Sequence, residues 1–453
     1  MLFFSCAHDI IFKNIFFIKV IKMKWLASVC LSIFTFIATL ITPSYVADVP
    51  EVKDDDFIPV MRFVATSDTH INTIGDTGCR RLSKMIKTAY AVSDNDKDYK
   101  KLDAVVFAGD ITDNGMRDSF YAFAGITNVE LREGTERLGI IAKSHDSYTY
   151  GRNSRKVFTL VTGQEADFHR VINDFHFIGI SRSEKISQYT EEQAKWLDEN
   201  IASAVKEDPE KPVFVFQHEH VLDTVYGSSS TDGWGIDFFS EVLNKYPQVV
   251  HISGHSHFPA NDPRAIWQGS FTAINDGGLA YFELAVDGKN NQFPDGKDTM
   301  SQALIIEVDK DNRVLVKVLD VDAGRFVKEF LIDNISDVNK EKYNPEKRKE
   351  KSSAPVFENG AEIEIRKEMA QYYVTVPQAK VSGDNEVFIY RISVTDKNGK
   401  EIYKSWEFSG YFFAEKPEKI TFDSFIILKN EFTVNVTAED VWGNSSEVLS
   451  AKY

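Results

Sequence analysis

The feature that most constrains this chain is a set of polar segments, each placed directly after an apolar, strand-like run. They are, in chain order, Asp68-Thr69-His70, Gly109-Asp110, His218 and Gly254-His255-Ser256-His257. Asp and neutral His are ligands that suit small divalent cations. In an open α/β sheet, the loops at the carboxyl ends of the strands are where a site is built. The ordered set therefore predicts a metal-centred hydrolase.

The apolar runs alternate with helical patterns, which predicts an α/β fold. The expected strands are a run beginning near Val60, Leu102–Ala108, Leu138–Ala142, Phe175–Ile180, Pro212–Gln217 and Val249–Ser253. Between the first two runs, apolar residues fall at helical spacing, namely Leu82, Met85, Ile86 and Ala89. Thr190 and Gln193 match a capping box at the start of a second helix.

These motifs resemble the signature of the calcineurin-like metallophosphoesterases, in the right order. The matching residues are Asp68-x-His70, Gly109-Asp110-x-x-Asp113-Asn114, His218 and Gly254-His255-x-His257, so the resemblance covers about residues 60 to 260. It implies an α/β (α+β) fold in which two sheets form a sandwich flanked by helices. It also implies two adjacent divalent ions and hydrolysis of phosphate esters.

The resemblance also implies a role for each motif residue. Asp110 would bridge the two ions, because a carboxylate offsets their mutual repulsion. The other ligands would be Asp68, His70 and His257 in one metal site, and Ser144, His218 and His255 in the other. His145 would lie beside the ions without binding them, where it stabilises the transition state or protonates the leaving oxygen. Asp146 would orient His145.

One motif departs from the family pattern. The family shows Gly-Asn-His followed by Asp or Glu, whereas this chain has Lys143-Ser144-His145-Asp146. Ser144 therefore stands where the family places a metal-ligating Asn. Three alternatives stay open: the Ser144 hydroxyl ligates weakly, a water takes its place, or the motif is aligned wrongly. Asn114 is the next candidate for this ligand after Ser144, although its motif is equally typical of a turn.

Composition sets limits on the function. The chain has 453 residues, which predicts two or three domains. A hydrophobic content of 43% with 26% charged residues is typical of a globular protein. The net charge of −16 argues against a nucleic-acid-binding patch, which needs a basic surface. It leaves a phosphate substrate open, because bound cations set the local field.

We expect residues 1–47 to be a signal or targeting segment. Met23-Lys24, then an apolar run over Trp25–Ile41 and small residues near Ala47, is typical of a signal peptide, and Met23 is an alternative start. An uncleaved membrane anchor is the alternative, since the run approaches spanning length. Of three cysteines only Cys79 lies beyond this segment, so no internal disulfide is expected. We therefore expect a secreted or cell-surface, extracytoplasmic bacterial protein.

The remaining chain is predicted to form a catalytic domain over residues 48–336, a charged linker over 337–354 and a β-sandwich over 355–453. A β-hairpin formed by Ala303–Val308 and Val314–Val321 would close the catalytic domain. The C-terminal strands are expected at Glu362–Ile365, Tyr372–Val376, Val387–Val394 and Phe432–Thr437. This pattern loosely resembles fibronectin type III or immunoglobulin-like modules, a resemblance that implies no catalytic role. No candidate ligand lies beyond His257, so we expect the sandwich to be separable.

The predicted function is an exported metal-dependent phosphoesterase that hydrolyses mono- or diesters at two Mn, Fe or Zn ions. Its partner would be a small phosphate ester or a cell-envelope phosphodiester, with the sandwich contacting the cell surface or wall. Two alternatives stay open. One is a degenerate relative that only binds at the cell surface, and the other is a mononuclear hydrolase that acts on other esters.

Overall fold

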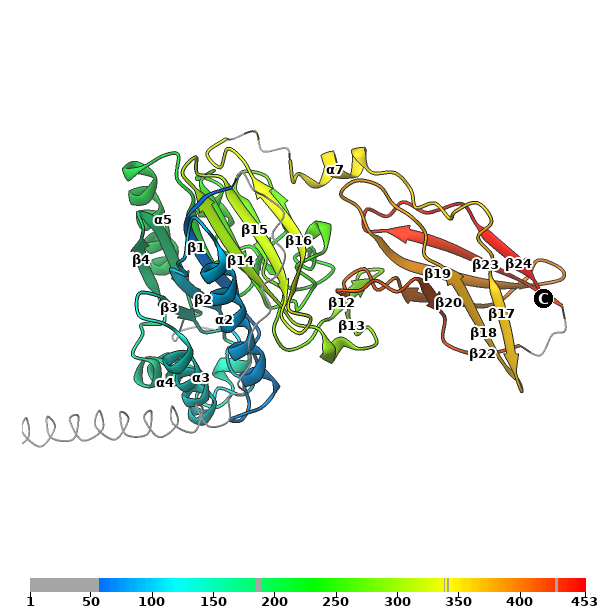
Figure 1. Cartoon of the computed structure of the whole chain (residues 1–453), viewed down its shortest axis with the longest axis horizontal. Coiled ribbons are helices and arrows are strands. Elements are labelled where there is room, and N and C mark those ends of the chain that lie inside the picture. Colours follow the sequence, from blue (N-terminus) through cyan, green and yellow to red (C-terminus); the bar gives the residue numbers. More distant parts are fainter. Residues whose placement is uncertain (1–56, 184–188, 338, 340–341, 428–430) are drawn as a thin grey trace, which may run out of the picture.

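The computed structural model of the chain describes residues 57–183, 189–337, 339, 342–427 and 431–453 (Figure 1). The expected targeting segment, residues 1–47, lies outside the described residues. Within the described residues, no helix has the length and apolar character needed to cross a bilayer. Figure 1 shows a larger body of sheets and helices joined to an elongated all-β region.

The first of two six-stranded sheets in the larger body has the order β16-β15-β14-β1-β2-β3. Its strands are β1 (Pro59–Thr66), β2 (Ala104–Ala108), β3 (Glu136–Ile140), β14 (Gln302–Asp309), β15 (Val314–Asp320) and β16 (Arg325–Ile332). β1, β2 and β3 run parallel, whereas β14, β15 and β16 are antiparallel. The predicted hairpin is confirmed, because β14 pairs with β15 with Ala303 opposite Leu319.

The second six-stranded sheet has the order β10-β11-β9-β6-β5-β4. Its strands are β4 (Phe168–Ile172), β5 (Phe175–Ile180), β6 (Val213–Gln217), β9 (Val249–Ser253), β10 (Ile266–Gln268) and β11 (Thr272–Asn275). The four central strands are parallel, and β4 and β10 are antiparallel edges. The strands expected at 175–180, 212–217 and 249–253 are therefore confirmed.

An aromatic and aliphatic core joins the facing sides of the two sheets. Phe63 of β1 lies edge-on to Phe177 of β5 and Phe214 of β6, with ring centroids 5.0 and 4.8 Å apart. Each such ring is fully buried, which contributes roughly 1.5–3 kcal/mol relative to exposure in water. This packing is what confirms the predicted two-sheet sandwich.

Helices cover the outer faces of both sheets. α2 (Thr77–Asn95), α3 (Arg117–Glu130) and α4 (Ser154–Thr162) pack on the first sheet. α5 (Glu191–Glu207) and α6 (Ser240–Leu243) pack on the second. The helical spacing at 82–89 is confirmed in α2, and the capping box of Thr190 and Gln193 starts α5.

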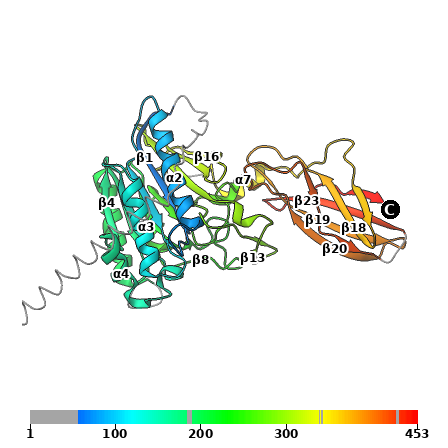
Figure 2. The same cartoon turned by 60° about the horizontal axis from the view of Figure 1, so that its bottom comes forward.

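Short elements line the loops between these strands and helices. The short strands are β7 (His220–Val221), β8 (Gly235–Ile236), β12 (Leu284–Val286) and β13 (Lys289–Gln292). The 3-10 turns are η1 (His145–Ser147), η2 (Gly151–Asn153), η3 (Pro263–Ala265) and η4 (Lys297–Thr299). β12 and β13 form a hairpin that lies beside the C-terminal region in Figures 1 and 2.

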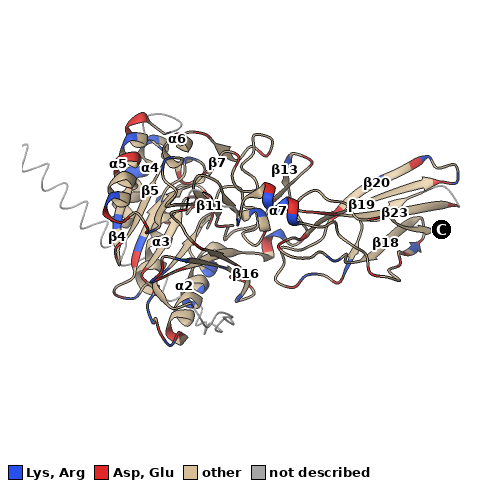
Figure 3. Cartoon of the chain, turned by 90° about the horizontal axis from the view of Figure 1, so that it is seen from above, with Lys and Arg blue, Asp and Glu red and all other residues tan. Residues whose placement is uncertain are grey.

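The C-terminal region begins with α7 (Pro345–Lys351) and then contains strands alone. The strands are β17 (Glu364–Glu368), β18 (Gln371–Pro377), β19 (Val387–Asp396), β20 (Glu401–Phe408), β21 (Lys419–Thr421), β22 (Phe425–Ile426), β23 (Phe432–Asp440) and β24 (Leu449–Lys452). They form two four-stranded antiparallel sheets around one apolar core. The expected all-β region is confirmed, whereas the fibronectin or immunoglobulin likeness and the domain bounds stay predictions. Figure 3 shows basic and acidic residues interspersed along α7.

The two regions share a buried apolar cluster. Phe282, Leu284 and Met300 of the larger body pack with Phe388 and Phe412 of the C-terminal region. The hydroxyl of Tyr411 donates a hydrogen bond to the buried carboxylate of Asp262. Removal of the sandwich would expose these apolar surfaces to water, so the packing argues against the expectation that the sandwich is separable.

Candidate metal centre

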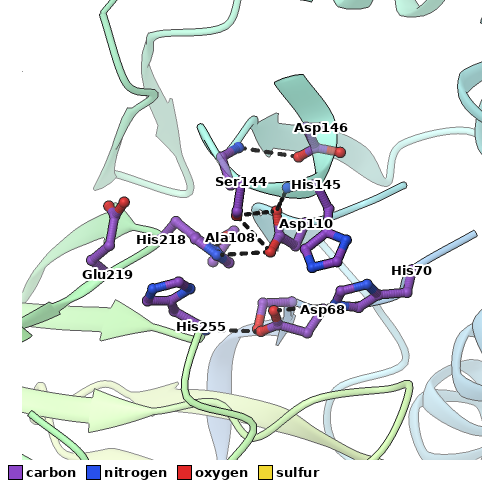
Figure 4. Close-up of polar contacts among 12 residues, drawn as sticks. Asp68, His70, Ala108, Asp110, Ser144, His145, Asp146, His218, Glu219 and His255 are labelled. Atoms are coloured by element: carbon purple, nitrogen blue, oxygen red, sulfur yellow. Dashed lines mark hydrogen bonds and ion pairs between the residues drawn. The ribbon is translucent and has the colours of Figure 1, made fainter. Parts of the chain in front are cut away.

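The candidate ligands gather at the carboxyl ends of parallel strands from both sheets (Figure 4). The loops after β1 and β2 stay paired, since the amide of Asp68 donates to Gly109 and the amide of His70 donates to Asp110, at 3.1 and 3.2 Å. The loops after β6 and β9 are tied in the same way, by the amide of Gly254 and the carbonyl of His218 at 3.0 Å. The strand-end placement predicted from the sequence therefore brings these segments together.

Left-handed backbone conformations turn the side chains inward at these loops. Five candidate ligands have positive φ angles, namely Asp68 at 51°, His70 at 47°, Asp110 at 45°, His255 at 71° and His257 at 55°. Such angles are uncommon outside glycine, although Asp and His are enriched among the exceptions.

Two glycines allow the loops to approach each other closely. A Cβ atom at Gly254 would lie 1.8 Å from Ser67 Oγ. A Cβ atom at Gly109, which also has a positive φ of 99°, would lie 2.7 Å from His218 Nδ1. Only glycine fits such contacts. The Gly-Asp and Gly-His pairs thus reflect close packing of the loops.

The first group of converging atoms comes from Asp68, His70 and His257. The two Nε2 atoms lie 3.2 Å apart, and Asp68 Oδ1 lies 3.7 Å from His70 Nε2 and 3.3 Å from His257 Nε2. Donors bonded to one tetrahedral ion at about 2.1 Å lie about 3.4 Å apart. Asp68 Oδ1 is buried without a hydrogen-bond partner among the described residues. These three atoms therefore fit a single divalent ion.

The second group comes from Asp110, His218 and His255, whose donor atoms lie within 4.8 Å of one another. His218 Nε2 lies 3.2 Å from Asp110 Oδ2, and it is buried with no hydrogen-bond partner among the described residues. A third set, His70, Asp110 and His145, meets the same limit. Because Asp110 belongs to two sets and His70 links them to the Asp68 group, the donors form one continuous cluster.

Backbone carbonyls fix which nitrogen each histidine offers. Nδ1 of His218 contacts the carbonyl of Ala108 at 2.9 Å, and Nδ1 of His257 contacts that of Tyr281 at 3.1 Å. A histidine that donates from Nδ1 to a carbonyl leaves the lone pair of Nε2 free for a metal. This arrangement directs both Nε2 atoms into the cluster.

The charges of the cluster favour added positive charge. Burial opposes a proton on His70, yet the carboxylates of Asp113, Asp68 and Asp110 raise its pKa to about 10. Burial likewise opposes a proton on His218, but Asp110 raises its pKa well above the usual value. Divalent cations would supply this charge in place of the protons.

Comparisons with known proteins identify the larger body. Residues 61–259 match the family model of the calcineurin-like phosphoesterases. These residues form a calcineurin-like phosphoesterase domain. The family normally binds divalent metals, and the chain is a phosphoester hydrolase.

Three individual proteins show how far the similarity to this chain extends. The probable glycerophosphodiester phosphodiesterase GpdQ of Arcobacter nitrofigilis is 28% identical over 208 residues, which make up 44% of this chain and 72% of that protein. A purple acid phosphatase from seeds of yellow lupin (Lupinus luteus) aligns at 13% identity with a TM-score of 0.45, covering 66% of this chain and 57% of that one. A β-glucuronidase of Parabacteroides merdae aligns over 88% of this chain and 63% of that one, at 8% identity and a TM-score of 0.25.

Ser144 of the altered motif lies beside the candidate metal donors of the phosphoesterase domain. Its hydroxyl is 2.7 Å from both carboxylate oxygens of Asp110. Asn114, the substitute donor, is engaged elsewhere, because its amide nitrogen donates to Asn72 Oδ1 at 2.7 Å and its oxygen accepts from the amide of Met116 at 3.0 Å. Position 144 is therefore better placed than Asn114 to face an ion.

His145 also belongs to the cluster of the phosphoesterase domain, and its ring is partly exposed. Its backbone amide donates to Asp110 Oδ1 at 3.1 Å, and its ring centroid lies 4.3 Å from that of His70. Its Nδ1 contacts the carbonyl of Asp113 at 2.8 Å. This contact leaves Nε2 free, as a proton donor requires.

Asp146 does not orient His145, so that expected role is corrected. The carboxylate of Asp146 is fully buried and accepts from the amides of Thr112 and Ala142, at 2.9 and 3.1 Å. These contacts tie the loop after β2 to the loop after β3. Asp113 takes the expected place instead, since its Oδ1 lies 3.5 Å from His145 Nδ1 and 3.4 Å from His70 Nδ1.

Three further residues support the centre and were not singled out from the sequence. Tyr281 stacks on His257 with ring centroids 4.0 Å apart. The hydroxyl oxygen of Ser67 lies 2.5 Å from Asp68 Oδ2 and 2.6 Å from Asp276 Oδ1. Asp276 directly follows β11, so the strand-end rule could have found it. Tyr281 follows no strand, and the sequence carries no comparable signal for it.

The histidines without a motif have structural contacts. His220 is fully buried between the hydroxyls of Ser253 and Ser256, each at 2.8 Å. His169 and His176 contact each other at 2.8 Å on β4 and β5, at the edge of the second sheet. These contacts give the three rings a structural role.

Proposed function

We propose that this chain is an exported, metal-dependent phosphoesterase that hydrolyses phosphate mono- or diesters through a dinuclear centre. The observation that carries the proposal is the continuous cluster around Asp110 within a calcineurin-like phosphoesterase domain. One group of donors, from Asp68, His70 and His257, would hold one ion. Asp110, His218 and His255, with Ser144 beside them, would hold the other, and Mn, Fe and Zn all suit such donors.

Two ions, when bound, would shield the phosphoryl charge and lower the pKa of a water molecule toward neutrality. The protein's own part is to hold these groups in place. The carboxylate of Asp110 belongs to one group and shares a donor set with His70 of the other, so it would offset the repulsion between two cations. His145 is the group placed to give a proton to the leaving oxygen, because its Nδ1 is held by Asp113 and its ring is partly exposed.

The proposed substrates are small phosphodiesters or phosphodiesters of the cell envelope. Support comes from the similar protein of Arcobacter nitrofigilis, which is described as a probable glycerophosphodiester phosphodiesterase. An envelope substrate is consistent with the targeting segment expected at residues 1–47. The C-terminal all-β region would then contact the cell surface or wall.

Hydrolysis of bis-p-nitrophenyl phosphate and p-nitrophenyl phosphate tests the activity. We expect turnover with added Mn²⁺ that disappears with a chelator and returns when metal is restored. Absence of metal-dependent turnover on both esters would refute the proposed phosphoesterase activity. Export is tested separately, by finding the protein outside the cytoplasm with an N-terminus near residue 48.

A second candidate is a degenerate relative that serves as a cell-surface binding protein. The observation that favours it is Ser144, which stands where the family pattern has Asn and whose hydroxyl contacts the carboxylate of Asp110. The seven other motif residues at the centre oppose it. Metal binding without turnover on any phosphate ester would favour this candidate.

A further inference from the structure

A groove of about 590 Å³ lies on the C-terminal region, away from the metal centre. Its floor is the outer face of the sheet β20-β19-β23-β24. Arg391 of β19 lies between Trp406 of β20 and Thr437 of β23, and Ser393 lies between Lys404 and Asn435 in the next row. Small-molecule sites typically have volumes of about 300–1,000 Å³. The groove is therefore large enough for a small ligand.

The catalytic domain supplies one wall of this groove. Two residues before Arg391 on the same face of β19, Ile389 and its partner Phe408 pack in the apolar cluster that joins the two regions. The groove opens where that cover ends, beside Asp287 of the β12–β13 hairpin. Oδ1 of Asp287 accepts from Arg391 at 2.7 Å, which fixes the hairpin against the sheet. The site is thus a cavity at a junction, and a flat sheet face alone would not form it.

The charges in the groove are paired with each other. Arg391 bonds Glu439 at 2.7 Å as well as Asp287, and Lys404 lies 3.9 Å from Glu401. Binding of a phosphate or nucleic-acid backbone needs cations that are free to pair with the ligand. The lining therefore does not select for a charged ligand.

The uncharged groups suit a ligand with hydroxyl groups and an apolar face. Among the described residues, the hydroxyls of Ser393 and Thr437 have no hydrogen-bond partner in the protein. A hydroxyl can both donate and accept, as the hydroxyls of a sugar do. The indole of Trp406 is half-buried, packs at the edge of the apolar cluster that joins the two regions, and lies edge-on to Phe408 with ring centroids 5.0 Å apart. An aromatic face attracts the slightly positive C–H groups of a pyranose ring.

We propose that this groove binds a neutral saccharide, with Trp406 as the stacking platform and Ser393, Thr437 and Asn435 as hydrogen-bonding groups. Oδ1 of Asn435 already accepts from Ser450 at 2.8 Å, which holds the amide in place. The inference rests on the proposed cell-surface contact and names its ligand. It leaves the reaction at the metal centre unchanged, because none of these residues lies near the cluster around Asp110.

Isothermal titration of the full chain with chitotetraose, cellotetraose and maltotetraose tests the inference. We expect saturable binding of at least one neutral tetrasaccharide. Trp406→Ala should weaken it at least tenfold while bis-p-nitrophenyl phosphate turnover stays within twofold. Tyr373→Ala is the matched control, because Tyr373 is an outward-facing aromatic of β18 on the other sheet and should leave affinity unchanged.

A second variant keeps the test decisive if Trp406→Ala fails to fold. Ser393→Arg leaves the indole in place and fills the floor of the groove, so it should also weaken binding at least tenfold. The inference is overturned if no tetrasaccharide binds the unaltered protein, or if binding survives both variants. If only the anionic polygalacturonate bound, and bound in a salt-sensitive way, the inference that the ligand is neutral would be overturned. Saccharide binding without phosphoester turnover would count against the proposed function only.

Discussion

The two halves of the candidate metal centre, one around Asp68 and one around Asp110, differ in how completely side chains enclose them. The Asp68 half presents a carboxylate oxygen and two ring nitrogens whose mutual distances are 3.2–3.7 Å. The Asp110 half presents two histidines and a carboxylate, and its fourth side chain is a serine that bonds the carboxylate. The Asp68 half is a compact group of three donors. The Asp110 half has the short hydroxyl of Ser144 at the position where the longer side chain of Asn would extend further towards an ion.

This difference teaches that a damaged motif need not abolish a site. Ser144 lies beside Asp110, so its hydroxyl faces the donors of this half although the motif differs from the family pattern. What changes is the strength of a neutral ligand, since a carbonyl oxygen is a firmer donor than a hydroxyl. We therefore expect unequal metal affinities, with the Asp68 half binding more tightly.

Replacement of Asp110 should have the largest effect, because its carboxylate is proposed to serve both halves of the centre. Asp110→Ala should lower bound metal below one equivalent and reduce turnover by roughly 10³-fold or more, since metal-based charge stabilisation is worth several kcal/mol. Metal analysis and steady-state rates measure both. If the variant retained two equivalents, Asp110 would not be the bridge.

Replacement of His145 should lower the reaction rate and leave the metal content of both halves unchanged. His145→Gln removes the proton donor and should lower kcat by about 10²-fold or more, as is typical for loss of a general acid. Two retained metal equivalents would distinguish this role from ligation. A loss of metal in step with activity would instead make His145 a ligand, as its place in the set with His70 and Asp110 allows.

Restoring the family residue at position 144 should reduce the inequality between the halves. Ser144→Asn should strengthen the weaker site by roughly 1–2 kcal/mol, or about 5- to 30-fold in affinity. Turnover at limiting metal should rise accordingly. Ser144→Ala is the control and should give no gain. Two equally tight sites in the unaltered protein, unaffected by Ser144→Asn, would show that position 144 is not a ligand.

The pH dependence of metal binding should show the smallest difference between the halves. The raised pKa values of His70, about 10, and of His218 mean that each ion displaces a proton near neutral pH. Affinity should thus increase as pH rises from 6 to 9, by about tenfold per pH unit for each proton released. Titration calorimetry in buffers of different ionisation enthalpy counts the protons. Binding that is independent of pH would contradict these charge states.

The sequence predicts those parts of the molecule that depend on neighbouring residues in the chain. Asp68 and Asp110 could be placed because each directly follows an apolar strand, and neighbouring parallel strands end at one edge. The role of Asp146 could not be placed, because its contacts with Thr112 depend on how two loops cross. The cluster that joins the two regions was missed because Phe282 and Met300 lie in a loop-rich stretch without periodicity.

The left-handed conformations at the ligand loops restrict which residues can occupy them in evolution and in the laboratory. A residue other than Gly, Asn, Asp or His typically loses about 1–2 kcal/mol in this conformation. Asp110, at a φ of 45°, can therefore change to Asn with little effect on the loop, whereas alanine removes a ligand and strains the backbone together. A lineage that loses its metal chemistry can keep the loop geometry by passing through asparagine. Comparing Asp110→Asn with Asp110→Ala would separate the cost of the missing charge from that of the strained turn.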